Sequence, residues 1–167
     1  PTPRTAKTTI IHAGKLMTEP GKPVLNQATL VTDGGKIRSV HQGFVDAAAL
    51  GLPADTEVVD LSNKFVLPGF MDLHVHITGS GLVGRMSGLN MRQENAFFAL
   101  NGATNAMTTL QAGFTTIRDL GATNEAIFSL RDAINLGIVP GPKIVAAGEG
   151  LSPTNGHGDA HNLKRAF

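Results

Sequence analysis

The sequence predicts an α/β protein in which a small β-rich unit precedes a series of parallel βαβ units. Short runs rich in β-branched residues fill the chain up to residue 67, and strand-like and helix-like runs alternate after Pro68-Gly69. The 167 residues are 41% hydrophobic and 16% charged, which is the composition of a globular chain rather than a disordered one. We therefore expect a small β domain over residues 1–67 and a second domain over residues 68–167.

The first domain is expected to be antiparallel. Asp33-Gly34-Gly35-Lys36 is a hairpin turn signal, because glycine accepts the positive φ that tight turns require. Ser62-Asn63 separates the last two strand-like runs. A unit this small has a thin core, so it should borrow strands or pack on a neighbour. The predicted strands are 8–13, 28–33, 36–41, 57–61 and 64–67.

The second domain is expected to consist of right-handed parallel units. Thr123 is a candidate helix N-cap, and Gly113 and Gly137 are candidate helix ends. The predicted order is strand 70–76, helix 92–112, strand 114–118, helix 124–136 and strand 143–147. The residues expected on the buried faces of the two helices are Ala96, Ala99, Leu100, Ala103, Met107 and Leu110, and Ile127, Leu130 and Ile134.

Several classes of partner are not expected. The formal net charge is +1, no charge run occurs and there is no Trp or Tyr, so neither nucleic acid nor an anionic membrane is an expected partner. The absence of Cys excludes disulfides and thiolate metal sites. No apolar stretch reaches the roughly 18 residues that a membrane span needs. Because the chain starts without Met, we expect a removed leader and a periplasmic or secreted protein, with a cytoplasmic location as the alternative.

Two histidines stand in the apolar run "FVLPGFMDLHVHI", residues 65–77. His74 and His76 are at i and i+2, so both imidazoles project from the same side of a strand, close to its carboxyl end. Two neutral imidazoles this close together suit a divalent metal ion, which binds them at ~2.0–2.1 Å. The alternative is a pair of core histidines with satisfied hydrogen bonds.

Other polar residues are weaker candidates. Asp72 should share the inward face with His74, either bonding a ligand histidine or serving as a structural carboxylate. Asp119 ends a strand beside Arg118, which favours an internal ion pair or a turn-forming Asx. His157, between glycines in "NGHGD", is a candidate substrate contact. The Gly-rich loop 78–88 is expected to fold over the pocket. Met86 and Met91 are expected to be packing residues, with lining of the pocket as the alternative.

The stretch "LPGFMDLHVHI" resembles the first barrel strand of the amidohydrolase superfamily, and "AGFTTIRDLGA" (112–122) resembles its second strand. "GPKIVAAGEGLSPTNGHGD" (141–159) is similar to the third strand and loop of the Xaa-Pro dipeptidase and related carboxypeptidase branch, which includes enzymes that hydrolyse ochratoxin-like amides. The resemblance implies the N-terminal part of a (β/α)8 TIM barrel, incomplete in this chain, preceded by a small β-sandwich-like composite domain.

The resemblance also implies a metal-dependent hydrolase, with His74 and His76 binding the more buried metal of a site with one or two ions, for which Zn²⁺ is the first expectation. In that superfamily a carboxylated lysine, two further histidines and an aspartate come from strands four to eight. This chain ends at Phe167, so no catalytic residue is assigned in it, and Lys164 is not given the bridging role.

The implied substrate is dipeptide-like, cleaved at an amide bond next to a C-terminal carboxylate. One alternative is a cyclic-amide hydrolase, similar to imidazolonepropionase, or a deaminase. An alternative of another class is a non-catalytic fragment. Three barrel strands leave an open edge. The expected partners are therefore the remainder of the barrel, either in the same polypeptide or as a separate chain, and further copies in a homo-oligomer.

Overall fold

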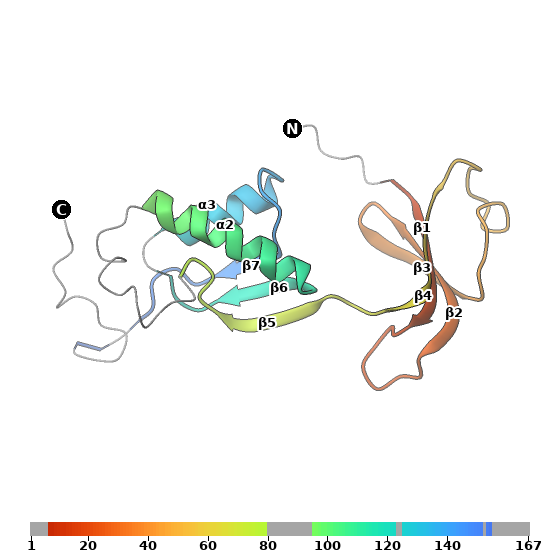
Figure 1. The fold of residues 1–167 in the computed structure, drawn as a ribbon, viewed down its shortest axis with the longest axis horizontal. Coiled ribbons are helices and arrows are strands. Elements are labelled where there is room, and N and C mark those ends of the chain that lie inside the picture. Colours follow the sequence, from red (N-terminus) through yellow and green to blue (C-terminus); the bar gives the residue numbers. More distant parts are fainter. Residues whose placement is uncertain (1–6, 80–94, 123–124, 152, 155–167) are drawn as a thin grey trace. The chain divides into compact units, whose positions relative to one another are not determined.

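The computed structural model describes residues 7–79, 95–122, 125–151 and 153–154. The chain divides into two compact units, Pro1–Pro68 and Gly69–Phe167 (Figure 1). The regular elements in the described part of the first unit are four strands, and the described part of the second unit contains three strands and two helices. The molecule is therefore α/β, with one sheet in each unit.

The first unit is a four-stranded mixed sheet in the order β3-β2-β1-β4. β1 pairs antiparallel with β2, and β2 with β3, but β4 runs parallel to β1. The expectation of a purely antiparallel unit is therefore wrong, because the connection 43–56 crosses the sheet before β4 begins. The strands are β1 (Thr9–Leu16), β2 (Leu25–Asp33), β3 (Lys36–Gln42) and β4 (Glu57–Val66).

β4 is one strand where two were predicted. Its pairing with β1 shifts register beyond Ala13, so Ser62 and Asn63 stay inside the strand as an irregularity instead of forming a turn. Gly14 makes room for this irregularity, because a Cβ atom there would lie 2.2 Å from the carbonyl oxygen of Ser62. The hairpin prediction is confirmed: Gly34 (φ 61°) and Gly35 (φ 74°) connect β2 and β3.

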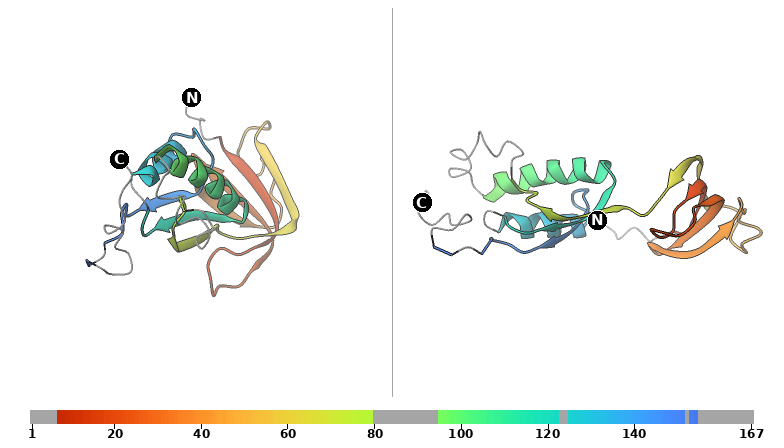
Figure 2. Two further views of the ribbon diagram at one scale, coloured as in Figure 1. Left: turned by 60° about the vertical axis from the view of Figure 1, so that its left-hand side comes forward. Right: turned by 90° about the horizontal axis from the view of Figure 1, so that it is seen from below.

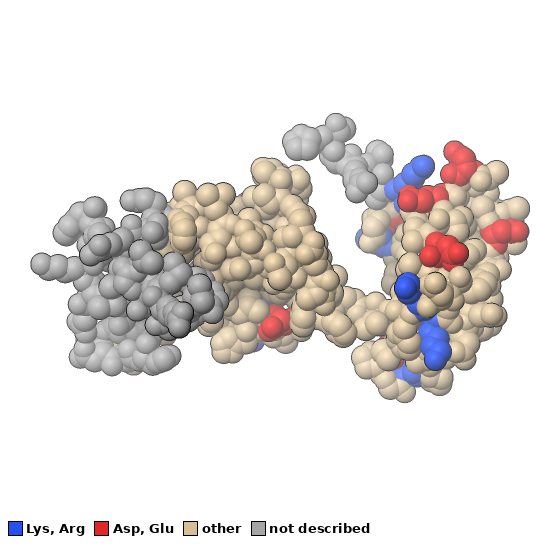
Figure 3. Space-filling model, in the orientation of Figure 1, with Lys and Arg blue, Asp and Glu red and all other residues tan. Residues whose placement is uncertain are grey.

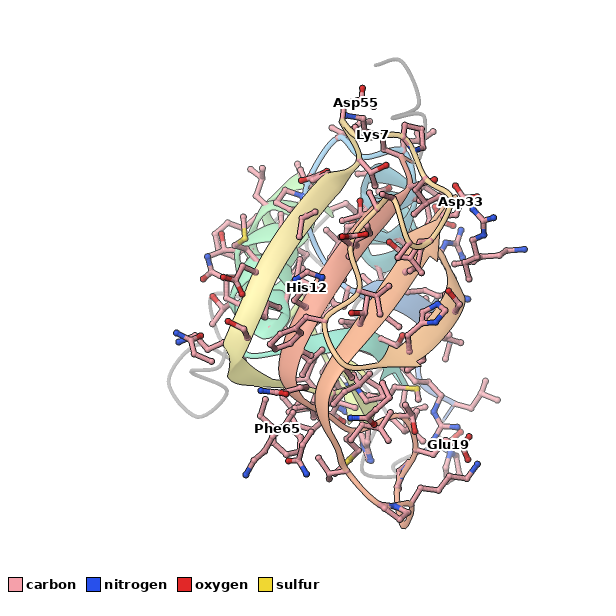
Figure 4. All side chains as sticks on the ribbon, turned by 90° about the vertical axis from the view of Figure 1, so that its right-hand side faces the viewer. Lys7, His12, Glu19, Asp33, Asp55 and Phe65 are labelled. Atoms are coloured by element: carbon pink, nitrogen blue, oxygen red, sulfur yellow. The ribbon has the colours of Figure 1, made fainter. Side chains whose placement is uncertain are left out.

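The segment 43–56 covers one side of this sheet, onto which Figure 4 looks. The Thr29 hydroxyl donates to Gly43 O (2.8 Å) and accepts from the backbone N–H of Val45 (2.9 Å). His12 lies within hydrogen-bond distance of the same segment, with Nε2 3.0 Å from Val45 O. These bonds attach the segment to the sheet, and the side chains buried in the unit include Ile10, Ala13, Leu16, Ala28, Thr29 and Val31.

The second unit contains a parallel sheet in the order β5-β6-β7, which confirms the predicted parallel pairing. Two helices, α2 and α3, lie side by side on one face of this sheet (Figures 1 and 2). Ile117 and Ile144 from the sheet pack there against Ile127 and Leu130 from α3. The elements are β5 (Phe70–Val75), α2 (Asn95–Gln111), β6 (Phe114–Asp119), α3 (Ala126–Asn135) and β7 (Lys143–Ala146).

The buried face of α2 matches the predicted one only in part: Ala103 packs against the core as expected. Leu100, expected inside, is 71% exposed, and Met107 is also exposed. The buried residues are instead Phe98, Gly102 and Ala106. Glycine allows the helix to approach its neighbours closely, since a Cβ at position 102 would lie 2.7 Å from Leu130 Cδ2.

The helix ends follow the prediction where they are described. Gly113 and Gly137 adopt positive φ (93° and 69°) directly after α2 and close to the end of α3. The buried face of α3 is confirmed, with Ile127 and Leu130 buried and Ile134 packed on the same core. The predicted N-cap, Thr123, and the predicted start of α2 at 92 lie outside the described residues.

Charged side chains are unevenly distributed. Figure 3 shows many Lys, Arg, Asp and Glu atoms over the first unit, whereas the described part of the second unit is largely uncharged in this view. Among the described residues, none of the helices has the length and hydrophobicity of a membrane span.

Candidate functional site

The two histidines singled out in the sequence lie at the carboxyl end of β5. Val75 pairs with Asp119, and Asp119 with Ala146, so the ends of the three parallel strands form one edge. Val75 and Ile77 pack into the core under the helices. His74 and His76 project to the opposite side and are exposed, with ring centroids 5.5 Å apart and planes at 74°. The structure therefore brings the two imidazoles together.

His76 makes one hydrogen bond that defines its chemistry. Its Nδ1 lies 2.6 Å from the carbonyl oxygen of Gly121. A carbonyl oxygen can only accept, so Nδ1 carries the proton and donates it. The neutral ring then keeps its lone pair on Nε2. Nε2 is thus available as a ligand atom, and the donor set of His74 and His76 fits a divalent metal ion.

Asp119 supports this arrangement from inside the unit. Its side chain is 0% exposed. The backbone N–H of Ile77 donates to Oδ2 (2.7 Å), and the backbone N–H of Gly121 donates to Oδ1 (3.1 Å). Burial raises the pKa of Asp119, and the hydrogen bonds from the two backbone N–H groups, followed by the electrostatic influence of His76, oppose this rise.

The turn-forming role predicted for Asp119 is confirmed, and the ion pair with Arg118 is not formed. Arg118 Nε instead donates to the carbonyl oxygen of Leu73 at 2.8 Å. The reason is strand geometry: neighbouring residues on a strand point to opposite faces, so Asp119 enters the core while Arg118 stays exposed.

Two asparagines of α2, which the sequence analysis missed, bind the segment that follows His76. Asn105 Nδ2 donates to Ile77 O (2.8 Å) and Gly79 O (3.0 Å). Asn101 Nδ2 donates to Thr78 O (3.1 Å) and Gly79 O (2.9 Å). Two amides at i and i+4, within a run of Ala and Gly on a helix, were the available signal, because such spacing places them side by side.

Asp72 does not share the histidine side of the sheet. It pairs with the buried Ile117, and the register then shifts between Asp72 and Val75. This extra residue interrupts the strict alternation on which the prediction depended. The Asp72 carboxylate accepts from the backbone N–H of His74 (3.0 Å), so it is the structural carboxylate that was the alternative reading.

The described part of the chain supplies two imidazoles and no larger ligand group. No set of three or more His, Asp or Glu residues that could hold a metal ion occurs in residues 7–79, 95–122, 125–151 and 153–154. The remaining candidates lie outside the described residues: His157, Met86, Met91, Lys164 and all of the loop 78–88 beyond Gly79.

Comparisons with known proteins identify the family of the part of the chain that carries this site. Residues 65–166 match the sequence profile of the Amidohydrolase family. Over 158 residues the chain is 29% identical to ochratoxinase of Aspergillus niger. This aligned region covers 95% of this chain and 32% of that protein.

Solved structures agree with this match. A Xaa-Pro dipeptidase with bound methionine superposes with a TM-score of 0.79 at 35% identity, covering 95% of this chain and 37% of that one. A prolidase complexed with N-methylphosphonate-L-proline superposes with a TM-score of 0.77 at 33% identity, covering 92% and 35%. The chain spans about a third of the length of these relatives. The family match covers β5 with the two histidines at its carboxyl end, and β6 and β7 of the same sheet. The chain therefore belongs to the amidohydrolase family.

Proposed function

We propose that this chain is the N-terminal part of a metal-dependent amidohydrolase and that His74 and His76 are two of its metal ligands. One observation carries the proposal: His76 donates its Nδ1 proton to Gly121 O, which leaves Nε2 as the free nitrogen. Metal-bound histidines almost always use their second nitrogen in this way, because the bond sets both tautomer and ring orientation.

The position of the pair supports the same proposal. The rings lie at the carboxyl edge of three parallel strands, where α/β barrels carry their active sites. We propose that β5, β6 and β7 are the first three strands of a (β/α)8 barrel. The first unit would then belong to a small β-sandwich that other strands complete.

The chain's own residues have a limited chemical task in this proposal. His74 and His76 hold the cation, while Gly121 and Asp119 keep the His76 ring in place. A divalent cation, for which Zn²⁺ is the first candidate, would lower the pKa of a water molecule to near 7 and polarise the substrate carbonyl. The other ligands and the general acid/base would come from strands beyond β7.

The proposed reaction is hydrolysis of an amide or peptide bond next to a C-terminal carboxylate. The support is that relatives of this chain are named ochratoxinase, Xaa-Pro dipeptidase and prolidase. The substrate would be a dipeptide or a similar N-acyl amino acid. Hydrolysis of cyclic amides is the competing activity within the family.

The first experiment determines which polypeptides form the protein. Intact-mass and native mass spectrometry of the purified protein would show either one longer chain or a complex in which a second chain completes the barrel, and would also give the oligomeric state. We expect one of these two arrangements in a homo-oligomer. A protein made of this chain alone, with no bound metal and no hydrolytic activity, would favour the non-catalytic alternative.

The second experiment measures metal content and hydrolysis together, in the protein with its complete barrel. We expect His74→Ala to remove both bound metal and turnover of N-acyl amino acids. His41→Ala is the matched control, because His41 lies in the first unit and bonds only Ser39 Oγ there (2.8 Å). Full activity of His74→Ala would contradict the proposal, and turnover confined to cyclic amides would redirect it.

A further inference from the structure

We propose that Asp119 is a positioning residue for His76 and that it sets the tautomer and orientation of this imidazole through Gly121 and Ile77. The inference rests on the proposed function, since it gives His76 the role of a metal ligand. Asp119 itself does not contact the imidazole through a hydrogen bond. It acts on the two backbone groups that determine where the ring lies.

The first backbone group is Gly121, which stands 45 residues from His76 in the sequence. Asp119 Oδ1 accepts from the N–H of Gly121 (3.1 Å), and the carbonyl of the same residue accepts from His76 Nδ1 (2.6 Å). The N–H and the carbonyl of Gly121 belong to adjacent peptide groups, so the carboxylate holds the turn that carries this carbonyl. Backbone bonds from Leu120 N–H to Val75 O (3.2 Å) and from Ala122 N–H to Gly148 O (2.8 Å) hold the same turn against the neighbouring strands.

The second backbone group is the peptide that directly follows His76. The Ile77 N–H donates to Asp119 Oδ2 (2.7 Å), and the Ile77 carbonyl accepts from Asn105 Nδ2 (2.8 Å). Both polar groups of this residue are thus bound by side chains instead of by a neighbouring strand. Asn101 Nδ2 donates to the carbonyl oxygens of Thr78 and Gly79, and the Gly79 N–H donates to His76 O (3.1 Å). The end of β5 cannot rotate without breaking several of these bonds.

Burying the carboxylate of Asp119 costs folding free energy. A fully buried carboxylate is expensive unless it is hydrogen-bonded, and the two hydrogen bonds found for Asp119 both come from the peptides that position His76. A position needed only for packing would be filled at lower cost by an apolar side chain like its neighbours in the core. The structure therefore assigns the carboxylate to holding the ligand histidine.

The hydrogen bond to Gly121 O determines which ring nitrogen of neutral His76 carries the proton. Neutral histidine in water prefers the tautomer with the proton on Nε2, whereas the geometry here requires the proton on Nδ1. Long-range ¹H–¹⁵N NMR spectra of the metal-free full chain at a pH where His76 is neutral would report which ring nitrogen carries the proton. We expect His76 to be protonated on Nδ1 in the wild type.

The variant test uses Asp119→Asn, with Asp60→Asn as a matched control in the first unit, where Asp60 Oδ1 accepts from the backbone N–H of Ser62 (2.9 Å). The asparagine keeps one acceptor, but its NH₂ group cannot accept the second backbone N–H, so the Gly121 turn or the Ile77 peptide loses its partner. We expect His76 to shift towards Nε2–H in Asp119→Asn and to stay unchanged in Asp60→Asn. In the protein with its complete barrel, Asp119→Asn should weaken Zn²⁺ binding by ~10–100-fold.

Wild-type His76 protonated on Nε2 would overturn the inference even if Asp119→Asn fails to fold. A folded Asp119→Asn chain with an unchanged tautomer would also overturn it. If His76 has the expected tautomer but the complete barrel retains no metal, the proposed function fails while the positioning of His76 by Asp119 stands. The two ideas are therefore tested separately.

Discussion

Each of the two units contains a strand histidine that lies within hydrogen-bond distance of a backbone carbonyl, and the two histidines have opposite consequences. In the first unit His12 Nε2 lies 3.0 Å from Val45 O, and the ring packs against Phe44 with centroids 5.2 Å apart. In the second unit His76 Nδ1 lies 2.6 Å from Gly121 O, and the ring faces a second imidazole at 5.5 Å.

The difference lies in what surrounds the rest of each ring. His12 is partly buried and holds the segment 43–56 on the sheet, so its hydrogen bond stabilises the fold. His76 is exposed, so its hydrogen bond leaves Nε2 accessible beside the His74 imidazole. A hydrogen bond from a histidine ring to a backbone carbonyl therefore indicates a metal site only where the second ring nitrogen faces other potential metal ligands.

The largest expected effects separate these two histidines. In the protein with its complete barrel, His76→Ala should abolish turnover and metal retention while changing the unfolding free energy little, because the side chain is exposed. His12→Ala should lower the stability of the first unit by about 1–2 kcal/mol, because Val45 O loses its partner. Metal content, turnover per folded molecule and urea unfolding measure the two outcomes. If folded His12→Ala also lost turnover, the proposed difference between the two histidines would be wrong.

The next effect compares two glycines that allow close approach, one in each unit. Gly14→Ala places a Cβ 2.2 Å from the backbone oxygen of Ser62, which cannot move without shifting β4. Gly102→Ala meets Leu130 Cδ2 at 2.7 Å, but this is the end of a flexible side chain, and alanine favours the helix by about 1 kcal/mol. We expect Gly14→Ala to destabilise by about 2–3 kcal/mol and Gly102→Ala by less.

Thermal unfolding of both glycine variants measures this order. Leu100→Ala is the control on α2, because a side chain that is 71% exposed should change stability by no more than ~0.5 kcal/mol. Equal destabilisation by Gly14→Ala and Gly102→Ala would mean that Leu130 is as rigid as a backbone carbonyl.

A smaller effect is expected at Thr29, whose hydroxyl makes one donated and one accepted hydrogen bond with the segment 43–56. Thr29→Val has a similar shape but leaves the N–H of Val45 and the carbonyl of Gly43 without this partner. We expect a loss of about 1–2 kcal/mol in the unfolding free energy. Faster hydrogen exchange of the Val45 amide in Thr29→Val, with unchanged exchange in α3, would locate the loss in the first unit.

The smallest expected effect is the pH dependence of Asp60. Hydrogen bonds from the side chain and backbone of Ser62, with a contribution from the charge of His12, lower the pKa of Asp60 below its ordinary value of 3.8. A carboxyl group whose pKa is lower in the folded state contributes stability above its unfolded pKa, and this contribution is lost as the pH falls through 3.8 and below.

Unfolding midpoints at pH 6 and pH 3 test this contribution. Asp60→Asn should reduce the difference in stability between the two pH values, while Asp55→Asn in the same unit serves as the exposed control. An identical pH dependence of the wild type and Asp60→Asn would show that Asp60 makes no contribution. The effect should be small because the group is exposed to solvent.

Much of the second unit could be predicted from local patterns. The strand with His74 and His76, the buried face of α3 and the glycines after both helices depend on residues a few positions apart, and periodicity detects such relations. The buried face of α2 was missed because its inward stripe consists of Gly102, Ala106 and a single large residue, Phe98. A search for the most hydrophobic stripe selects Leu100 and Met107 instead.

Local sequence therefore indicates that imidazoles at i and i+2 stand on one side of a strand, since side chains alternate wherever the strand is regular. The irregularity between Asp72 and Val75 shows where this alternation ends. Local sequence also determines which segments become helices and strands. The direction of β4, the burial of Asp119 and the proton position on His76 depend on groups far apart along the chain, such as Ile77 and Asp119 at a separation of 42 residues. Only folding of the chain brings those groups within hydrogen-bonding distance, so no local sequence pattern can predict these contacts.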